Sequence, residues 1–184
     1  MSRRGRQKPL FFCEKNSNLH NVTQYSIILM NIMKGVRYKM LKKALGKRVA
    51  VVDSVKDWED AIRTAAKPLV EDHSVETSYV EAMINNVKKF GNYIVVAPKV
   101  AMPHSRPEDG VNKNCLALLK LNNGVYFGDT SDEDNNVHLV FVLGAVDSNS
   151  HIDTLTALME VIDDEEKVES IIKCKTVEDI MKLI

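Results

Sequence analysis

The chain has 184 residues, of which 45% are hydrophobic and 27% are charged, and its formal net charge is zero. By length this is one domain, and the apolar fraction is sufficient for a hydrophobic core. No stretch approaches the about 20 apolar residues that cross a bilayer. The cysteines Cys13, Cys115 and Cys174 are widely spaced and odd in number. They argue against a disulfide framework or a structural zinc site and favour a reducing, cytoplasmic compartment.

The neutral total conceals two parts of opposite charge. Residues 1–48 carry 12 Lys or Arg and one acidic residue, whereas the rest of the chain carries 13 Lys or Arg and 24 acidic residues. We therefore predict a basic N-terminal extension over residues 1–47 and an acidic globular domain over residues 48–184. A positively charged extension can bind the phosphate backbone of nucleic acids without sequence specificity. The domain is acidic and shows no aromatic stacking platform, so we expect no nucleic-acid partner.

Three interpretations of the extension stay open. It is a disordered arm, or it contains a basic amphipathic helix over about 22–45 that packs on the domain or lies on a membrane. Alternatively, it is sequence upstream of a true start at Met40, because organised sequence begins just after that residue.

From residue 48 onward, the spacing of apolar residues predicts strands and helices in alternation. Asp53 or Ser54 is the expected cap of the first helix, and Pro68 is expected to disturb its last turn. Gly91 is expected to end the second helix. In chain order, the predicted elements are a strand over 48–52, a helix through 58–69, a helix over about 78–90 and a buried strand over 93–97.

The second half begins with a loop over residues 98–110, which contains three prolines. Two strands then follow one another with no helix between them, so we predict an α/β fold in which a mixed sheet is sandwiched between helices on both faces. The remaining predicted elements are strands over 115–121, 124–128 and 137–146, an acidic loop over 129–136, a helix capped by Asn149 or Ser150, and short helices over 165–173 and 177–184.

The most informative segment is the loop around His104, which reads Pro103-His104-Ser105-Arg106-Pro107. Proline removes backbone freedom, so the imidazole is expected on a stiff loop. That loop follows a strand, and ligands of α/β sheets bind at strand ends. A neutral imidazole nitrogen is a nucleophile. Taken alone, the same spacing is also typical of an exposed or capping loop histidine.

A second histidine, His151, lies in the expected first turn of a helix after the most apolar strand. Free N–H groups and the helix dipole favour an anion there, and a donor imidazole would add to a phosphate pocket. On its own, His151 is equally typical of a surface position.

Together, these residues resemble a known family. The stretch reads Gly91-Asn92-Tyr93-Ile94-Val95-Val96-Ala97-Pro98, then Ala101-Met102-Pro103-His104, then Arg106-Pro107-Glu108-Asp109-Gly110-Val111. It resembles the phospho-acceptor segment of enzyme IIA domains of the bacterial sugar phosphotransferase system (PTS), in the mannitol/fructose superfamily. Ascorbate-type members are the most similar. The resemblance continues through Ser150-His151 and covers about residues 48–184.

The resemblance implies a function. His104 would accept a phosphoryl group from the phosphohistidine of the carrier HPr and pass it to a cysteine of a IIB component. His151 would orient the phosphoryl group or donate a hydrogen bond to it. The membrane IIC component would take part indirectly, during uptake of ascorbate or a related carbohydrate. No metal or cofactor is expected.

Other residues have less certain roles. Arg106, Ser105 and Ser150 are candidates for phosphate binding or partner docking. Glu108 or Asp109 is either a hydrogen-bond partner of the second ring nitrogen of His104 or part of a solvated acidic turn.

One departure concerns a phosphate-binding arginine. Mannitol-type members carry one on the helix before the active strand, whereas this chain reads Asn85-Asn86-Val87-Lys88 there. Arg106 or Lys88 would have to substitute. A regulatory IIA-like protein, which senses phosphorylation without feeding a permease, is the alternative function, because it would use the same histidine.

Overall fold

The computed structural model describes residues 32–147 and 152–184. Contacts divide the chain into two units, Met1–Gly35 and Val36–Ile184. Residues 32–45 are helical, and residues 36–45 of this helix, which belong to the second unit, are called the N-terminal helix below. Its Leu41 and Leu45 are fully buried in the core of the second unit. The predictions made for residues 1–31 lie outside the described residues.

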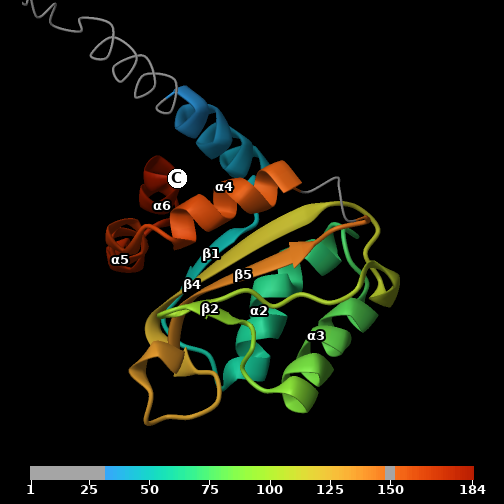
Figure 1. Cartoon of the computed structure of the whole chain (residues 1–184). Coiled ribbons are helices and arrows are strands. Elements are labelled where there is room, and N and C mark those ends of the chain that lie inside the picture. Colours follow the sequence, from blue (N-terminus) through green and yellow to red (C-terminus); the bar gives the residue numbers. More distant parts are fainter. Residues whose placement is uncertain (1–31, 148–151) are drawn as a thin grey trace, which may run out of the picture. The chain divides into compact units, whose positions relative to one another are not determined.

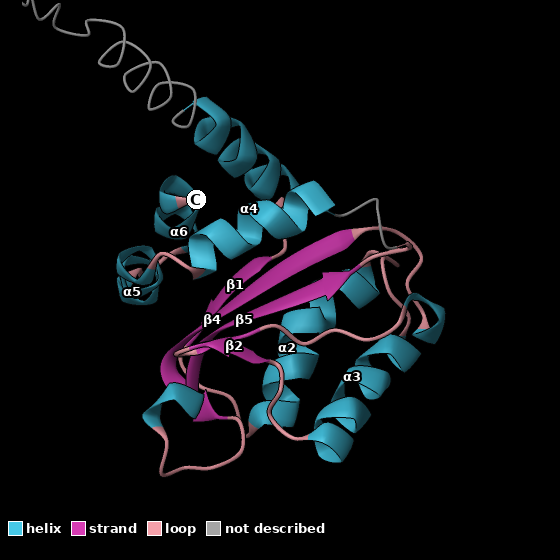
Figure 2. Ribbon diagram, in the orientation of Figure 1, coloured by secondary structure: helices cyan, strands magenta, loops and turns pink. Residues whose placement is uncertain are grey.

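The second unit is built around a five-stranded mixed sheet with the strand order β1-β4-β5-β3-β2 (Figure 2). Two neighbouring pairs, β1 with β4 and β3 with β5, run parallel. The other two pairs, β2 with β3 and β4 with β5, are antiparallel. The strands are β1 (Val49–Val52), β2 (Val95–Ala97), β3 (Val100–Ala101), β4 (Cys115–Tyr126) and β5 (Asn136–Gly144).

Helices cover both faces of this sheet (Figure 1). One face is covered by α2 (Trp58–Glu71) and α3 (Thr77–Phe90). The other is covered by α4 (Ile152–Ile162), α5 (Glu165–Lys173), α6 (Val177–Leu183) and the N-terminal helix. The predicted fold class is therefore confirmed. Among the described residues, no helix combines the length and the apolar character that crossing a bilayer requires.

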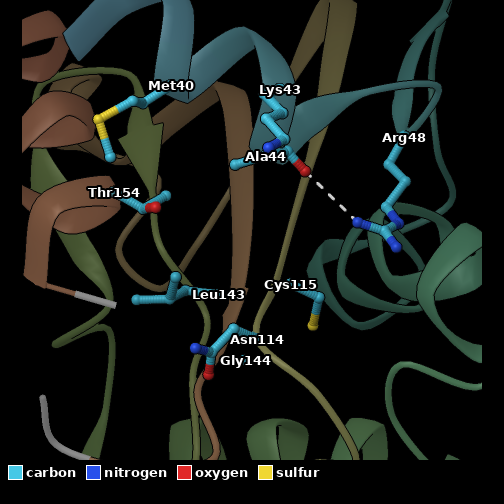
Figure 3. A pocket seen from close by; sticks show the side chains of 9 residues that line it. All are labelled: Met40, Lys43, Ala44, Arg48, Asn114, Cys115, Leu143, Gly144 and Thr154. Carbon is cyan, nitrogen blue, oxygen red and sulfur yellow. Dashed lines mark hydrogen bonds between the residues drawn. The ribbon is translucent and has the colours of Figure 1, made fainter. Parts of the chain in front are cut away.

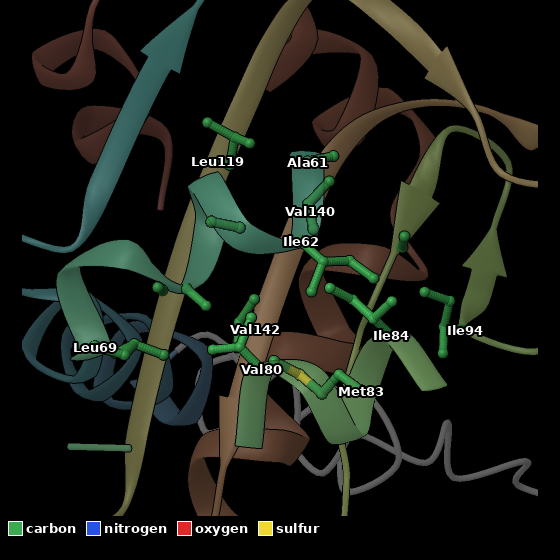
Figure 4. Close-up of a cluster of buried hydrophobic side chains, with 14 of the residues drawn as sticks. Ala61, Ile62, Leu69, Val80, Met83, Ile84, Ile94, Leu119, Val140 and Val142 are labelled. Atoms are coloured by element: carbon green, nitrogen blue, oxygen red, sulfur yellow. The ribbon is translucent and has the colours of Figure 1, made fainter. Parts of the chain in front are cut away.

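The central strands are buried on both sides, so their alternate residues enter two cores. On β4, Ala117 and Leu119 belong to the core formed with α2 and α3, and Figure 4 shows Leu119 in this core. Their neighbours Leu116 and Leu118 pack with α4, α5 and α6. A strand covered on both faces reads as a nearly continuous apolar run, which is why this sequence predicted strands here so clearly.

The first helix differs from its prediction at both ends. Asp57, rather than Asp53 or Ser54, is the cap, and its side chain accepts a hydrogen bond from the Asp60 N–H at 2.9 Å. The helix also continues through Pro68 to Glu71, with the Pro68 carbonyl accepting from the Asp72 N–H. The proline therefore removes one N–H donor without ending the helix.

Two strands also differ from expectation. The segment predicted as a buried strand over 93–97 forms the shorter β2, which lies at the sheet edge and is half-buried. In contrast, β4 is unbroken across the predicted gap at residues 122–123. It continues because its last residues pair again with β5 after a shift in register, at Val125 with Val137. The proline-rich loop contains β3 and a short 3-10 helix, η1 (Pro107–Asp109).

Candidate functional site

The candidate site lies where two parallel strands end. Strands β3 and β5 run side by side, with Ala101 opposite Val140. The chain leaving β3 leads to His104, and the chain leaving β5 leads to Ala145 and Asp147. Both stretches meet at a cavity of about 260 Å³. Its lining is Tyr79, Met102, His104, Ser105, Pro107, Leu143, Ala145, Asp147 and Leu155.

The ring of His104 is oriented by the backbone. Its Nδ1 lies 2.8 Å from the carbonyl oxygen of Met102. A carbonyl oxygen can only accept a hydrogen bond, so Nδ1 carries the proton, and in the neutral ring Nε2 carries the free electron pair. The ring of Tyr93 also packs edge to face with the His104 ring, with centroids 5.8 Å apart and planes at 82°. The imidazole therefore presents Nε2 as its nucleophilic atom.

Neither Glu108 nor Asp109 is the partner of the His104 ring, contrary to one of the two sequence interpretations. The Asp109 carboxylate instead accepts hydrogen bonds from the Ser105 hydroxyl and from the Arg106 N–H. Glu108 lies 4.0 Å from the Arg106 guanidinium at the surface. These acidic residues therefore shape the loop after His104 rather than the imidazole itself.

The buried hydroxyl of Tyr79 ties this loop to the neighbouring strand. It donates a hydrogen bond to the Leu143 carbonyl at 2.7 Å and accepts one from the Ser105 N–H at 3.1 Å. Burial raises the pKa of Tyr79 to about 12, so the phenol stays protonated at neutral pH and remains a donor. One side chain of α3 thus joins the loop that follows β3 to the end of β5.

A second α3 side chain completes this arrangement. Asn86 donates from its amide nitrogen to the Ser105 hydroxyl oxygen at 3.0 Å. The Ser105 hydroxyl in turn donates to Asp109. Ser105 lines the cavity, and its hydroxyl is hydrogen-bonded to Asn86 and Asp109. The residue after His104 is therefore held through both its backbone and its side chain.

The two cations considered as substitutes for the missing arginine differ in position. The Nζ of Lys88 lies 2.9 Å from Glu59 on α2 and forms an ion pair with it. The Arg106 side chain is 81% exposed. Arg106, two residues after His104, is therefore the more exposed cation of this pair.

His151 and Ser150 lie outside the described residues. Asp147, three residues before Ser150, and Leu155, four residues after His151, both line the cavity with His104.

Sequence reasoning did not single out Tyr79 or Asn86. Both lie on α3, seven residues apart, which is two helical turns and places them on the same face. The sequence did contain a signal, because Tyr79 and Asn86 are spaced to lie on the same helix face as the buried Met83. It does not say which loop the face meets, because the contact with Ser105 depends on how α3 packs on the sheet.

A separate cavity of about 360 Å³ lies between the N-terminal helix, the end of β5 and α4 (Figure 3). It shares Leu143 with the candidate site, and the buried Cys115 is among its lining residues. Burial raises the pKa of Cys115 to about 11, so the sulfur is a thiol rather than a nucleophilic thiolate at neutral pH. Within residues 32–147 and 152–184, no three His, Cys, Asp or Glu side chains gather to hold a metal ion.

Comparison with known proteins identifies relatives across most of the chain. A sequence model described as the phosphoenolpyruvate-dependent sugar phosphotransferase system, EIIA 2, matches residues 44–184. The ascorbate-specific PTS system EIIA component of Escherichia coli strain K12 is 31% identical over 142 residues, which cover 77% of this chain and 91% of that protein. The residues matched by the family model include His104 and the whole five-stranded sheet.

Two solved structures share the fold. The mannitol-specific cryptic phosphotransferase enzyme IIA of Escherichia coli has a TM-score of 0.71 at 31% identity, over 78% of this chain and 96% of that one. Enzyme IIAMtl of Escherichia coli, solved in complex with phosphorylated enzyme IIBMtl, has a TM-score of 0.63 at 28% identity, over 75% of this chain and 94% of that one.

Proposed function

Because the chain belongs to the EIIA type 2 family of the phosphoenolpyruvate-dependent sugar phosphotransferase system, we propose that His104 is its phosphoryl acceptor. The phosphoryl group comes from the phosphohistidine of HPr and passes to a cysteine of a IIB component. The observation that carries this proposal is the hydrogen bond from Nδ1 to the Met102 carbonyl, which leaves Nε2 as the nucleophile at a cavity.

Phosphoryl transfer to and from His104 requires no change in the protonation of Nδ1. When Nε2 attacks phosphorus, a P–N bond forms to His104 and the P–N bond to the donor histidine breaks. The phosphorylated ring then carries a positive charge. The Met102 carbonyl stabilises this charge by accepting the hydrogen bond from the Nδ1–H group. In the second step a thiolate of IIB attacks phosphorus, and the electron pair of the breaking P–N bond returns to Nε2.

Positioning is the main demand of phosphoryl transfer, since the attacking and leaving atoms must lie in line. Tyr79, Asn86 and Asp109 meet this demand by fixing Ser105. In our proposal, His151 donates to the phosphoryl oxygens, and Ser150 and Arg106 assist in binding or docking. The placement of Asp147 and Leu155 in the cavity lining supports this role for the segment between them.

The sugar need not enter the site around His104, because the phosphoryl group reaches the sugar only through IIB and the membrane IIC component. We propose ascorbate or a related carbohydrate as the transported solute, on the basis of the ascorbate-specific relative, and action in the cytoplasm. The solved complex of enzyme IIAMtl with phosphorylated enzyme IIBMtl supports IIB as the acceptor.

The test is incubation with phosphorylated HPr that carries a radioactive phosphoryl group. We expect a label on this chain that is labile to acid and stable to base, and its transfer to a IIB cysteine. His104→Ala should abolish the label, whereas His151→Ala should slow transfer and keep the acceptor. A label that survives His104→Ala would contradict the assignment. A label that no IIB component accepts would favour the regulatory alternative.

A further inference from the structure

The N-terminal helix packs on the domain along one side only. Leu41 is fully buried in the core that also contains α4, α5 and α6. Beside it, the Arg37 guanidinium pairs with Glu160 on α4, and the Nζ of Lys167 on α5 lies 4.0 Å from the centroid of the Tyr38 ring. These contacts fix the helix to the domain and turn its opposite side outward.

An apolar row lies on the outward side. Val36 is 55% exposed, and Met40, one helical turn later, is 37% exposed. Ile32 and Met33, which precede them in the sequence, are 58% and 45% exposed. The described part of the chain exposes eight large hydrophobic side chains, and four of them therefore fall within nine residues. Such a concentration of exposed apolar groups is typical of a surface that contacts a partner.

A row of cations accompanies the apolar row. Lys39 and Lys43 are exposed and four residues apart, so they share a stripe of the helix next to the apolar side chains. Lys47, in the turn after the helix, is also exposed. The sequence from residue 15 to residue 52 contains no acidic residue. The outward side thus combines apolar groups with positive charge, which is the pattern of a helix that lies on an anionic lipid surface.

The charge of this face distinguishes between the partners that could cover it. A second copy of the chain would place the same lysines against one another. Residues 1–31 carry five Lys or Arg and one acidic residue, so they repel this face too. A nucleic acid attracts the lysines through its phosphates but leaves the apolar row exposed to water. An anionic bilayer matches both rows, because its headgroups attract the lysines and its acyl chains accept Val36 and Met40.

We propose that the outward face of the N-terminal helix, which carries Val36, Met40, Lys39 and Lys43, binds an anionic membrane surface. The rest of the domain favours one orientation, since residues 49–184 contain 13 Lys or Arg and 24 acidic residues and are repelled by the same lipids. All four residues precede residue 44, where the match to the family model begins. The inference does not depend on His104, and it would place the protein beside the membrane.

The experiment is co-sedimentation of the full chain with lipid vesicles. One set of vesicles contains only phosphatidylcholine, and the other contains phosphatidylcholine mixed with the anionic phosphatidylglycerol. The protein should bind the anionic vesicles and leave the neutral ones unbound. Added NaCl should weaken the binding, because salt screens the attraction between lysines and headgroups. Equal binding to both compositions, or no binding to the anionic vesicles, would overturn the inference.

Two pairs of variants test the two rows. Lys39→Gln should lower the partition coefficient about fivefold, which is the contribution of one cation near an anionic surface. Its control is Lys67→Gln, which removes an exposed lysine of α2 and should change nothing. Met40→Ser should lower the coefficient several-fold. Its control is Phe90→Ser, which removes an exposed apolar side chain from α3, on the other side of the sheet. Circular dichroism shows whether each variant retains its fold.

The remaining outcomes are equally decisive. If Met40→Ser binds anionic vesicles as tightly as the wild type, charge acts alone and the inference is wrong. It is also wrong if Lys67→Gln weakens binding as much as Lys39→Gln. A wild-type dimer that Met40→Ser loses in size-exclusion chromatography would assign the face to a second copy instead. Without vesicles, phosphorylated HPr should label Lys39→Gln and the wild type equally. Failed labelling would therefore contradict only the proposed function, and failed vesicle binding only this inference.

Discussion

The Tyr79 hydroxyl bonds to two backbone groups that are far apart in the sequence, the N–H of Ser105 and the carbonyl of Leu143. Ser105 follows His104, and Leu143 belongs to the end of β5. The hydroxyl therefore holds together the two chain segments that line the candidate site. Its exposure is only 1%, so water does not replace either bond.

Tyr79→Phe should therefore lower both stability and transfer rate. The change leaves two buried backbone groups with one partner fewer, which costs about 1–3 kcal/mol in the free energy of unfolding. The rate of phosphoryl transfer to His104 should fall several-fold, because the adjacent loop gains freedom. Urea denaturation and single-turnover labelling measure the two effects. Tyr126→Phe is the control, since the Tyr126 hydroxyl bonds to Glu133 at an exposed position and its loss should cost less than about 0.5 kcal/mol.

The position of the phosphoryl group on the ring is a second prediction. Because Nδ1 donates to the Met102 carbonyl, the group should attach to Nε2. In protein labelled with 15N at histidine, the nitrogen coupled to 31P should be Nε2. The proton on Nδ1 should also exchange slowly with water. Coupling of 31P to Nδ1 would show that the ring turns before it reacts and would contradict the geometry described above.

The sequence predicted the parts of the site that depend on neighbouring residues. The loop around His104 was recognisable because Pro103 and Pro107 restrict the backbone and an apolar strand precedes them. The same was true of the α3 end, where Gly91 adopts a positive φ of 82° that favours glycine. These features are set within a few residues of chain.

Features that depend on packing were not predicted. Ser105 meets Tyr79 across 26 residues and Leu143 meets Tyr79 across 64 residues, so no local pattern reports either contact. The unbroken strand β4 was missed for the same reason. Asn122, Asn123 and Gly124 have the composition of a turn. They remain in the strand because its last residues pair with β5.

Alkaline pH should destabilise the protein in a defined range. Burial raises the pKa of Cys115 from 9.0 to about 11 and that of Tyr79 from 10.0 to about 12. Both acids ionise more easily in the unfolded chain, so the stability they contribute is complete below pH 9. It is lost as the pH rises through the shifted values. Each group should lower the free energy of unfolding by about 1.4 kcal/mol per pH unit between its two pKa values.

Urea denaturation at pH 8, 9, 10 and 11 measures this loss. Cys115→Ala should flatten the decline between about pH 9 and 11, at the cost of a lower stability at pH 8. Cys174→Ala should flatten it less, because Cys174 is only half-buried. An unchanged slope in Cys115→Ala would show that the thiol ionises equally easily in the folded protein.

The last prediction concerns the turn after His104, where Asp109 and Glu108 are neighbours with different contacts. The Asp109 carboxylate accepts from the Ser105 hydroxyl and the Arg106 N–H, whereas Glu108 is 67% exposed and lies only near the Arg106 guanidinium. Asp109→Asn keeps the shape of the side chain but replaces one acceptor oxygen with a donor. It should slow phosphoryl transfer several-fold and cost about 1 kcal/mol in stability.

Glu108→Gln removes the same charge one residue away and should change both quantities little, because exposed ion pairs contribute about 0–1 kcal/mol. Comparing the two variants therefore separates hydrogen bonding within the loop from the loss of one negative charge beside the site. Equal slowing in both variants would assign the effect to charge alone. Slowing confined to Asp109→Asn would show that the transfer rate depends on how firmly Ser105 is held, since Asp109 reaches His104 only through that residue and the turn.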